Sequence, residues 1–587
     1  MRVMKSPRSP EARKGHRRRA TQVEGAMREP SAIWDLLLLF ALPVLLALVN
    51  SDWLWGAPVR DSWIYYGYFK RLPLYLNTHL NSYYSSRLSV VIPGWLAHSL
   101  FSPLFAHLAL HFVLVWGALG GFYLATRDLL GRRSALFSSV ALASHPFFLI
   151  ALGDNYVDGF GITYTLLALA VLTRAARSAS PAWLIAAAGG IGVLIVSANL
   201  FYVVFLPFLA AHYLVARGRT PVGALLRASG WSMLGASSVF VAFCLASKGL
   251  GGRYLFFLSS THFAGSLLSR PNPMGLPTGT WLPTAVWLVF PCLVLAGMPL
   301  VWWRSRGART PELLWSQGAN LGFAILMVAV QASPIAVVLQ YCFYGSLLIP
   351  FAFLAFAGQV KGWIDELREE PFRRLLGLTA AAFVASHAVR LGPDFLSGAP
   401  AAPIVVCLLA GFGVPAALLA SRGRRAAALL VPCLAVSMLL ARNSTSADRI
   451  WDFFGSDRRN LFLQIAAAEA TARRYDAGVG LYYWWNQDDP LNGLYDATAA
   501  TALSGARILN LSFPDPMSGI AANGAPLAPG MKIAILSRLP TATAVGMAAL
   551  ERAGFETTPL GQESVPGPGS TFRMDVIEIR ARRQSNP

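Results

Sequence analysis

The chain contains 587 residues, of which 55% are hydrophobic and only 13% are charged, a composition that excludes an assembly of ordinary soluble domains. The 49 lysines and arginines outnumber the 29 acidic residues, which in a soluble protein would suggest nucleic-acid binding. Because the basic residues lie mostly in short loops between long apolar runs, they indicate a polytopic membrane protein instead. The five cysteines all lie inside apolar runs without metal-ligand spacing, so they predict neither a disulfide framework nor a zinc site.

The chain begins with a basic segment, residues 1–30, that holds nine basic and three acidic residues. Because positive segments stay on the cytoplasmic side of membranes, this tail is predicted to be cytoplasmic and to touch anionic lipid. The first apolar run, 33–49, is longer than the core of a signal peptide and has no small-residue cleavage site before Asp52. We therefore expect a retained transmembrane helix.

The long first outer loop, residues 50–103, is rich in aromatic residues and contains Asp61. Four basic residues are interspersed in it, Arg60, Lys70, Arg71 and Arg87. A carboxylate in an aromatic patch at the membrane boundary, with cations nearby, is a candidate general base or substrate clamp. The alternative is an interfacial connector whose aromatic rings lie at headgroup depth.

Apolar runs long enough to cross a bilayer as helices recur along the residues up to 441. Counting the run at 33–49, about thirteen are predicted; the others are 104–125, 134–152, 156–173, 182–196, 200–215, 222–246, 281–303, 313–330, 335–357, 375–389, 403–420 and 426–440. Residues 31–441 are therefore expected to form a transmembrane domain.

The turn between the third and fourth runs, residues 153–159, carries two carboxylates, Asp154 and Asp158. Residues four apart face the same direction if the turn is helical, so both are candidates for the catalytic site. The alternative is that Asp158 or Asn155 caps the fourth helix, which would contribute about 1 kcal/mol and involve no chemistry.

The outer loop between the seventh and eighth runs, residues 248–280, has cations and no acidic residue. Its candidate binding residues are Lys248, Arg253, His262 and Arg270. Cations near the headgroups that no carboxylate neutralises suit the phosphate of a lipid carrier. Ordinary contact with lipid headgroups is the alternative.

Orientation follows from the loops between the apolar runs: eighteen basic residues lie on the side of the N-terminus and eight on the opposite side.

From residue 442, interspersed charges and short β-rich runs predict a small α/β domain over 442–587. An odd number of spans puts this domain outside the cytoplasm. Its expected helices are 457–475, 494–503 and 542–553, and its expected strands are 479–485, 506–513, 532–537 and 572–579.

Several of these positions carry a resemblance to a known family. They are Asp61 in the first outer loop, the run 83–88 (YYSSRL) with Pro93 leading into the second transmembrane helix, and the Asp154 and Asp158 pair. Together they resemble the GT-C superfamily of polyprenyl-phosphate-sugar-dependent glycosyltransferases, of the protein mannosyltransferase and lipid A aminoarabinose transferase type. The resemblance is best in the first 220 residues.

The resemblance implies that Asp61 is the general base on the acceptor and that basic residues hold the departing carrier phosphate, with inversion at the anomeric carbon. Tyr83, Tyr84 and Arg87 are then expected to bind substrate.

Members of the superfamily often have a second acid beside the first, whereas Ser62 follows Asp61 here. This departure leaves a divalent metal open and shifts the supporting carboxylate role to Asp154 and Asp158. No metal ligands and no other cofactor are predicted.

The predicted function is that of a multi-pass enzyme of the inner (plasma) membrane, a hexosyl- or pentosyltransferase that moves a sugar from a polyprenyl phosphate to a glycan, lipid or protein acceptor on the outer face. A transporter or lipid flippase of the envelope is the main alternative, but such proteins usually place ionisable sites near the midplane between internal repeats. A non-enzymatic envelope scaffold is a third, which tolerance of Asp61→Asn would favour. The sequence names neither the sugar nor the acceptor.

Overall fold

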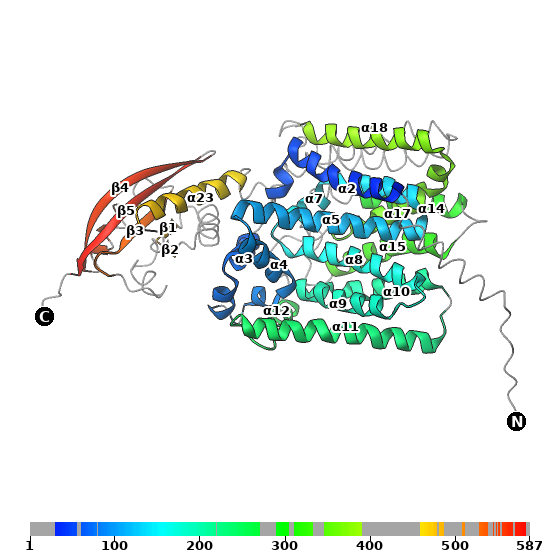
Figure 1. Cartoon of the computed structure of the whole chain (residues 1–587), viewed down its shortest axis with the longest axis horizontal. Helices are drawn as coiled ribbons and strands as arrows, with labels where there is room; N and C mark the ends of the chain where they lie inside the picture. The colour runs from blue at the N-terminus through cyan, green and yellow to red at the C-terminus, as the bar shows by residue number, and fades with distance from the viewer. Residues whose placement is uncertain are drawn as a thin grey trace, which may run out of the picture.

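The structure is a computed structural model in which most of the chain forms a bundle of long helices with a small mixed sheet at one end (Figure 1). It describes residues 30–55, 60–78, 80, 82–218, 220–269, 289–304, 310–332, 346–389, 458–477, 481–485, 507–510, 528–537, 544, 547–548, 550–551, 554–567 and 570–582.

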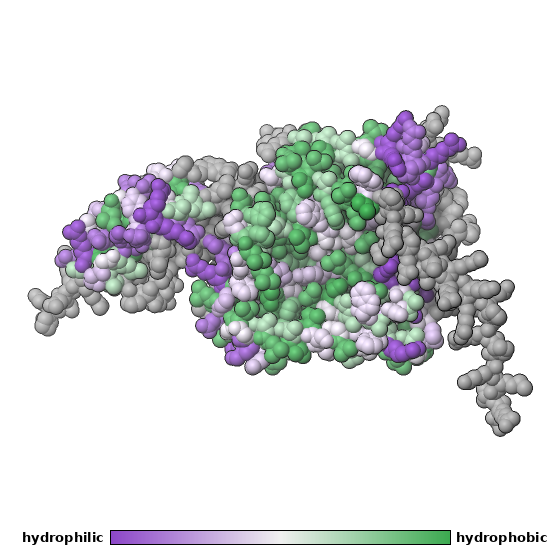
Figure 2. Space-filling model, viewed as in Figure 1, coloured by the Kyte–Doolittle hydropathy of each residue, from purple (hydrophilic) through white to green (hydrophobic). Residues whose placement is uncertain are grey.

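The bundle consists of helices that are rich in apolar residues. They are α2 (Pro30–Val49), α5 (Pro103–Leu130), α6 (Arg132–Ala143), α7 (Pro146–Gly153), α8 (Val157–Arg177), α9 (Ala182–Ala198), α10 (Phe205–Arg217), α11 (Val222–Gly249), α14 (Val289–Arg304), α15 (Pro311–Ala332), α17 (Ile349–Glu366) and α18 (Glu369–Ala388). Their exposed surface is largely hydrophobic (Figure 2), as expected where lipid replaces water.

Five of the described helices are long and apolar enough to cross a membrane, α5, α8, α10 with its preceding turn, α11 and α15, and the bent pair α6 and α7 would make a sixth. Helices also form over the predicted runs at 33–49, 182–196 and 375–389. The runs at 403–420 and 426–440 lie outside the described residues, so the total of thirteen spans stays a prediction.

The run at 134–152 forms two helices rather than the single one predicted. The axes of α6 and α7 differ by 67° at a break that contains His145. Pro146 occupies the first position of α7, where a proline is tolerated, and it disfavours helical backbone at the residue before it. The bend directs α7 into the bundle, toward the short 3-10 helix η1 (Asp52–Trp55).

The first outer loop is mostly helical. It contains α3 (Arg60–Thr78), the 3-10 helix η2 (Tyr83–Ser86) and α4 (Leu88–Leu100), which lie at the end of the bundle together with α12 (Leu258–Leu268) (Figure 1). Helix α3 breaks at Arg71, whose φ of −141° and ψ of 48° are not helical, two residues before Pro73. Most of the described part of the loop is therefore helical.

The C-terminal part contains a five-stranded sheet in the order β2-β1-β3-β5-β4. Helix α23 (Arg458–Arg474) and the strands β1 (Leu481–Trp485), β2 (Arg507–Asn510), β3 (Lys532–Ser537) and β5 (Ser570–Arg582) fall within or across the predicted elements. Strand β1 runs parallel to β2 and β3, while β5 runs antiparallel to β3 and β4. The predicted helix at 494–503 lies outside the described residues.

Strand β4 (Phe555–Gly567) was not predicted. Its sequence contains two prolines and two glycines, which normally argue against a strand. Proline is tolerated at a sheet edge, because the missing N–H can face away from the neighbouring strand, and β4 is an edge strand with a register shift between Pro559 and Gly561. The irregular register thus accommodates the prolines and glycines of β4, which are the reason why the sequence did not predict this strand.

Candidate active site

Asp61 lies in the first turn of α3, where two tyrosine hydroxyls from η2 hold its carboxylate. Tyr84 donates to Oδ1 at 2.6 Å and Tyr83 donates to Oδ2 at 3.0 Å. Burial, and then the adjacent Asp61, raise the pKa of both tyrosines, so both hydroxyls remain protonated donors at neutral pH. The half-buried carboxylate is therefore oriented by neutral groups.

Local hydrogen bonds within η2 position this tyrosine pair. The Ser82 hydroxyl accepts a bond from the Tyr84 amide at 3.3 Å, and Ser85 and Ser86 donate to the backbone carbonyls of Ser82 and Tyr83 at 2.6 Å each. Serine side chains that bond nearby backbone favour such tight turns over a longer helix. The run YYSSR therefore places two phenol groups side by side, opposite α3.

Arg87 lies between η2 and α4 and is buried, with 6% of its surface exposed. Its Nη1 donates to the hydroxyl of Tyr65, and its guanidinium lies 4.7 Å from the ring centre of Tyr83 and 5.7 Å from that of Tyr65. Within the described part of the chain, Nε of Arg87 has no hydrogen-bond partner. A buried cation with an unused donor is costly, which makes it a candidate anion-binding group.

Asp158 lies in the first turn of α8 and is 1% exposed. The Tyr202 hydroxyl donates to Oδ1, while Oδ2 has no hydrogen-bond partner among the described residues. Arg87 is close enough to attract this carboxylate electrostatically. The ring of Tyr156 packs edge-on to the ring of Tyr65, with centroids 6.0 Å apart. Because Tyr156 is the N-cap of α8, this contact joins the start of α8 to the tyrosine that Arg87 bonds.

The turn between Asp154 and Asp158 is not helical. Asp154 and Tyr156 are both extended, with φ and ψ of −96° and 141° and of −116° and 164°, so the helical geometry that would point both carboxylates in one direction does not form. Neither Asn155 nor Asp158 caps α8, because its N-cap is Tyr156, without a side-chain cap bond. Asp154 is buried at the end of α7.

Helix α12 covers η2 from the side opposite α3. Phe263 stacks on the ring of Tyr83 with centroids 4.1 Å apart, and the hydroxyls of Ser260 and Ser86 share a hydrogen bond. The predicted cations are more peripheral, since Lys248 and Arg253 are exposed, as is His262.

Two of these cations lie near other side chains of the described segments. Lys248 lies 5.8 Å from the ring centre of Tyr254, and Arg253 lines a small hollow together with Ser85 and Ser247. Arg270 lies outside the described residues.

Sequence analysis missed four aromatic residues of this cluster, Tyr65, Tyr156, Tyr202 and Phe263. Tyr65 and Tyr202 bond the charged groups, while Tyr156 and Phe263 pack on tyrosines of the cluster. Nothing in local spacing distinguishes these four residues from interfacial aromatics. Lys70, expected as a cation near Asp61, pairs instead with Glu469 at 3.6 Å.

No group of three or more His, Cys, Asp or Glu side chains that could hold a metal occurs in the described ranges. The buried His107 and His111 bond the backbone carbonyls of Leu54 and Leu152 at 2.7 Å, and His111 also bonds the Asn155 side chain at 2.9 Å. These histidines join α5 to η1 and α7.

A second charged cluster lies at the other end of α2 and α5. Figure 2 shows a hydrophilic patch near the junction of α17 and α18. Arg132 donates two hydrogen bonds of 2.7 Å to the carboxylate of Asp35, and Tyr123 donates a third of 2.6 Å. Glu369 of α18 pairs with Arg133 at 3.2 Å and with Arg132 at 3.5 Å. These charges join α2, α5, α6 and α18.

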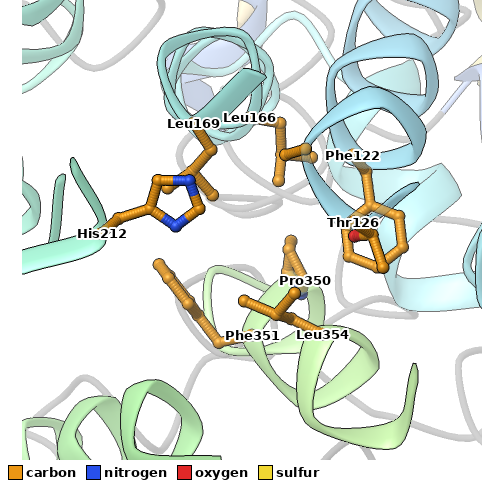
Figure 3. A pocket seen from close by; sticks show the side chains of 9 residues that line it. Phe122, Thr126, Leu166, Leu169, His212, Pro350, Phe351 and Leu354 are labelled. Atoms are coloured by element: carbon orange, nitrogen blue, oxygen red, sulfur yellow. The ribbon is translucent and has the colours of Figure 1, made fainter. Parts of the chain in front are cut away.

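An apolar cavity between α5, α8, α10 and α17 contains two polar side chains, Thr126 and His212 (Figure 3). Both ring nitrogens of His212 are used, Nε2 with Thr173 at 2.7 Å and Nδ1 accepting from Trp315 at 3.0 Å. The space, about 10 Å³, is roughly that of one water molecule. It is too small for a substrate.

Comparison with solved structures finds similar helical membrane proteins. ArnT from Cupriavidus metallidurans bound to undecaprenyl phosphate is 13% identical, with 92% of this chain and 99% of that chain covered and a TM-score of 0.45. Its apo structure is 14% identical, with coverages of 95% and 100% and a TM-score of 0.46. The Archaeoglobus fulgidus oligosaccharyltransferase in complex with Zn and sulfate is 14% identical, with coverages of 92% and 72% and a TM-score of 0.38.

Both proteins are transferases of the GT-C superfamily, the superfamily that the sequence resembles. No protein-family model matches the chain, and no curated protein matches it. A functional assignment therefore depends on the geometry of the Arg87 cluster.

Proposed function

We propose that this chain is a membrane glycosyltransferase that moves a sugar from a polyprenyl-phosphate carrier to an acceptor at the Asp61 end of the bundle. The observation that carries the proposal is the buried Arg87, whose Nε has no hydrogen-bond partner among the described residues and whose guanidinium lies against the rings of Tyr65 and Tyr83.

Arg87 is suited to hold the carrier phosphate. Its planar guanidinium can donate two parallel hydrogen bonds to phosphate oxygens, and burial strengthens them because water does not compete. Among the described residues its guanidinium donates to the neutral hydroxyl of Tyr65. A bound phosphate would therefore supply the negative charge that balances the guanidinium and an acceptor for Nε. Stacking on Tyr83 keeps the guanidinium plane in place.

Asp61 is suited to be the general base. Tyr83 and Tyr84 orient its carboxylate without neutralising it, and its partial exposure lets an acceptor hydroxyl or amine approach. In the transfer, the acceptor atom attacks the anomeric carbon and gives its proton to Asp61. The bond from that carbon to the phosphate oxygen breaks, and the electron pair leaves with the phosphate at Arg87. Attack opposite the leaving group inverts the anomeric centre.

The remaining predicted residues are assigned supporting roles. Oδ2 of Asp158, which has no hydrogen-bond partner within the described ranges, is an acceptor for a sugar hydroxyl or a water next to Arg87, and Asp154 is the second supporting carboxylate. The exposed Lys248, Arg253 and His262, with Arg270, attract the anionic carrier toward the site. A divalent metal remains open, and the sheet-bearing part with the Asp61 end is proposed to lie outside the cytoplasm.

The test uses purified full-length protein in lipid nanodiscs with radiolabelled polyprenyl-phosphate sugars and candidate glycan, lipid and peptide acceptors. Thin-layer separation should show label moving to an acceptor and free polyprenyl phosphate accumulating in equal amount. Arg87→Ala should abolish transfer, whereas Arg227→Ala, a matched change of an exposed arginine on α11, should leave it intact.

The flippase alternative predicts another result in the same preparation. Label would cross the bilayer of a vesicle while remaining on its carrier, and Arg87→Ala would slow that movement. Movement of intact carrier without transfer to any acceptor would overturn the transferase proposal.

A further inference from the structure

An ion pair joins the C-terminal helix α23 to α3, the helix that carries Asp61. Lys70 Nζ lies 3.6 Å from Glu469 Oε2, and the two side chains are only 19% and 16% exposed. Arg473, one turn further along α23, donates to the other oxygen of Glu469 at 2.6 Å and is itself 69% exposed. Glu469 therefore connects a cation of its own helix with a cation of the bundle.

The Glu469 carboxylate favours the charged form of Lys70. Burial lowers the pKa of Lys70, the neighbouring Glu469 opposes that decrease, and Arg71 and Arg473 add to it. Without Glu469, a largely buried ammonium would face two guanidinium groups. Removing one member of a buried pair is strongly destabilising because the other charge is left uncompensated.

The position of Lys70 on α3 explains why the contact can affect Asp61. Helical geometry ends at Arg71, so the regular segment that begins at Arg60 ends at Lys70. Asp61 and Lys70 thus occupy the two ends of one straight segment, about 14 Å apart at 1.5 Å per residue. Fastening the Lys70 end restricts the tilt of the segment and hence the place of the carboxylate at the other end.

Helix α23 is itself held by the sheet. Gln464 donates to the carbonyl of Val565 on β4 at 2.8 Å, and Ala468 and Ala472 are fully buried in the core that reaches the sheet. The same helix contacts η1, the turn that precedes α3. Helix α23 therefore contacts both the sheet and the turn that precedes α3.

We propose that Glu469 is a positioning residue, through which the C-terminal part holds α3 and aligns Asp61 with Tyr83 and Tyr84. The role in catalysis deepens the proposed transferase function and rests on it, whereas the mechanical contact does not. The C-terminal part thus becomes a structural component of the active site.

Hydrogen exchange of the full chain in nanodiscs tests the contact without any substrate. Glu469→Gln, which preserves size, should speed exchange of α3 backbone amides by roughly tenfold, because opening of that segment becomes easier. Glu551→Gln, a matched change of an exposed glutamate, should leave α3 unchanged. Unaltered α3 exchange in Glu469→Gln would overturn the proposal.

Charge reversal supplies the second arm. Lys70→Glu and Glu469→Lys should each speed α3 exchange and lower kcat for transfer with little change in KM for the donor. The double variant K70E/E469K should restore both, which a merely local destabilisation would not do. Failure of the double variant to restore α3 exchange also contradicts the pairing.

The two readouts separate the two proposals. If α3 exchange responds as expected but no donor is turned over by the unaltered protein, the contact stands and the transferase function fails. If transfer occurs and the variants change exchange without changing kcat, the transferase stands and the positioning role fails.

Discussion

The two ends of the bundle treat buried aspartates differently. Asp35 and Asp158 are 3% and 1% exposed, so burial does not distinguish them. Asp35 accepts three hydrogen bonds, two from Arg132 and one from Tyr123, whereas Oδ2 of Asp158 and Nε of the nearby Arg87 have no partner among the described residues. The completed ion pair of Asp35 joins helices, whereas Asp158 and Arg87 each keep an atom to which a ligand could bond.

We propose that the presence or absence of hydrogen-bond partners, rather than burial or charge, separates structural from functional carboxylates in this protein. Folding alone would favour completing every pair, because an unused buried donor or acceptor costs about 1–3 kcal/mol. The Asp61 end carries that cost. Strain or unsatisfied groups of this kind are expected at sites that bind something. Four substitutions test the comparison.

Asp35→Ala should cause the largest effect, lowering the free energy of unfolding by about 3–5 kcal/mol, because it leaves Arg132 without its bidentate partner. Denaturant unfolding in detergent measures it. Asp365→Ala at the same end removes an exposed pair with Lys361 and should cost at most about 1 kcal/mol. Equal effects of the two changes would remove the distinction between the clusters.

Asp61→Asn should leave unfolding unchanged and reduce transfer by roughly 10² or more, because the amide keeps the size of the side chain but cannot accept the proton. Donor binding should survive. Single-turnover transfer with saturating donor measures the chemical step. If Asp61→Asn retains near-normal turnover while Asp158→Asn abolishes it, the general base belongs to the start of α8.

Arg87→Lys preserves the charge but loses the planar fork, so affinity for sugar-free polyprenyl phosphate should fall roughly tenfold to a hundredfold. Equilibrium binding in nanodiscs measures this, with Arg227→Lys as the exposed control. An affinity equal to that of the unaltered protein would mean that Arg87 only packs with the tyrosines and does not bind the phosphate.

Lys248→Ala should have the smallest effect, at most about fivefold on carrier affinity, because exposed charges contribute up to about 1 kcal/mol. The effect should vanish in 1 M salt, because salt then screens the attraction between exposed charges beyond about 3 Å. A large loss that persists in high salt would move the phosphate site from Arg87 to the periphery.

The sequence predicted much of the bundle because its signals are local. Long apolar runs identify α5, α8 and α11 as membrane helices, since nearly every residue must be apolar where lipid surrounds the helix. The bend between α6 and α7 was missed, although Pro146 marks it, because the apolar run continues through the break. Strand β4 was missed because its pairing with β5 overrides its own low strand propensity.

For the site, the costly placement of carboxylates near the membrane singled out Asp61 and Asp158 in the sequence, whereas Arg87 was identified through the resemblance to the GT-C superfamily. The partners of all three residues are set by the packing of the folded chain. The Tyr202 hydroxyl donates to Asp158 from another helix. Lys70, which the sequence placed among the cations near Asp61, forms an ion pair with Glu469. The physical reason is that desolvation acts on each residue separately and leaves a mark in composition, whereas hydrogen bonds and ion pairs depend on which distant segments the packing brings within about 3–4 Å.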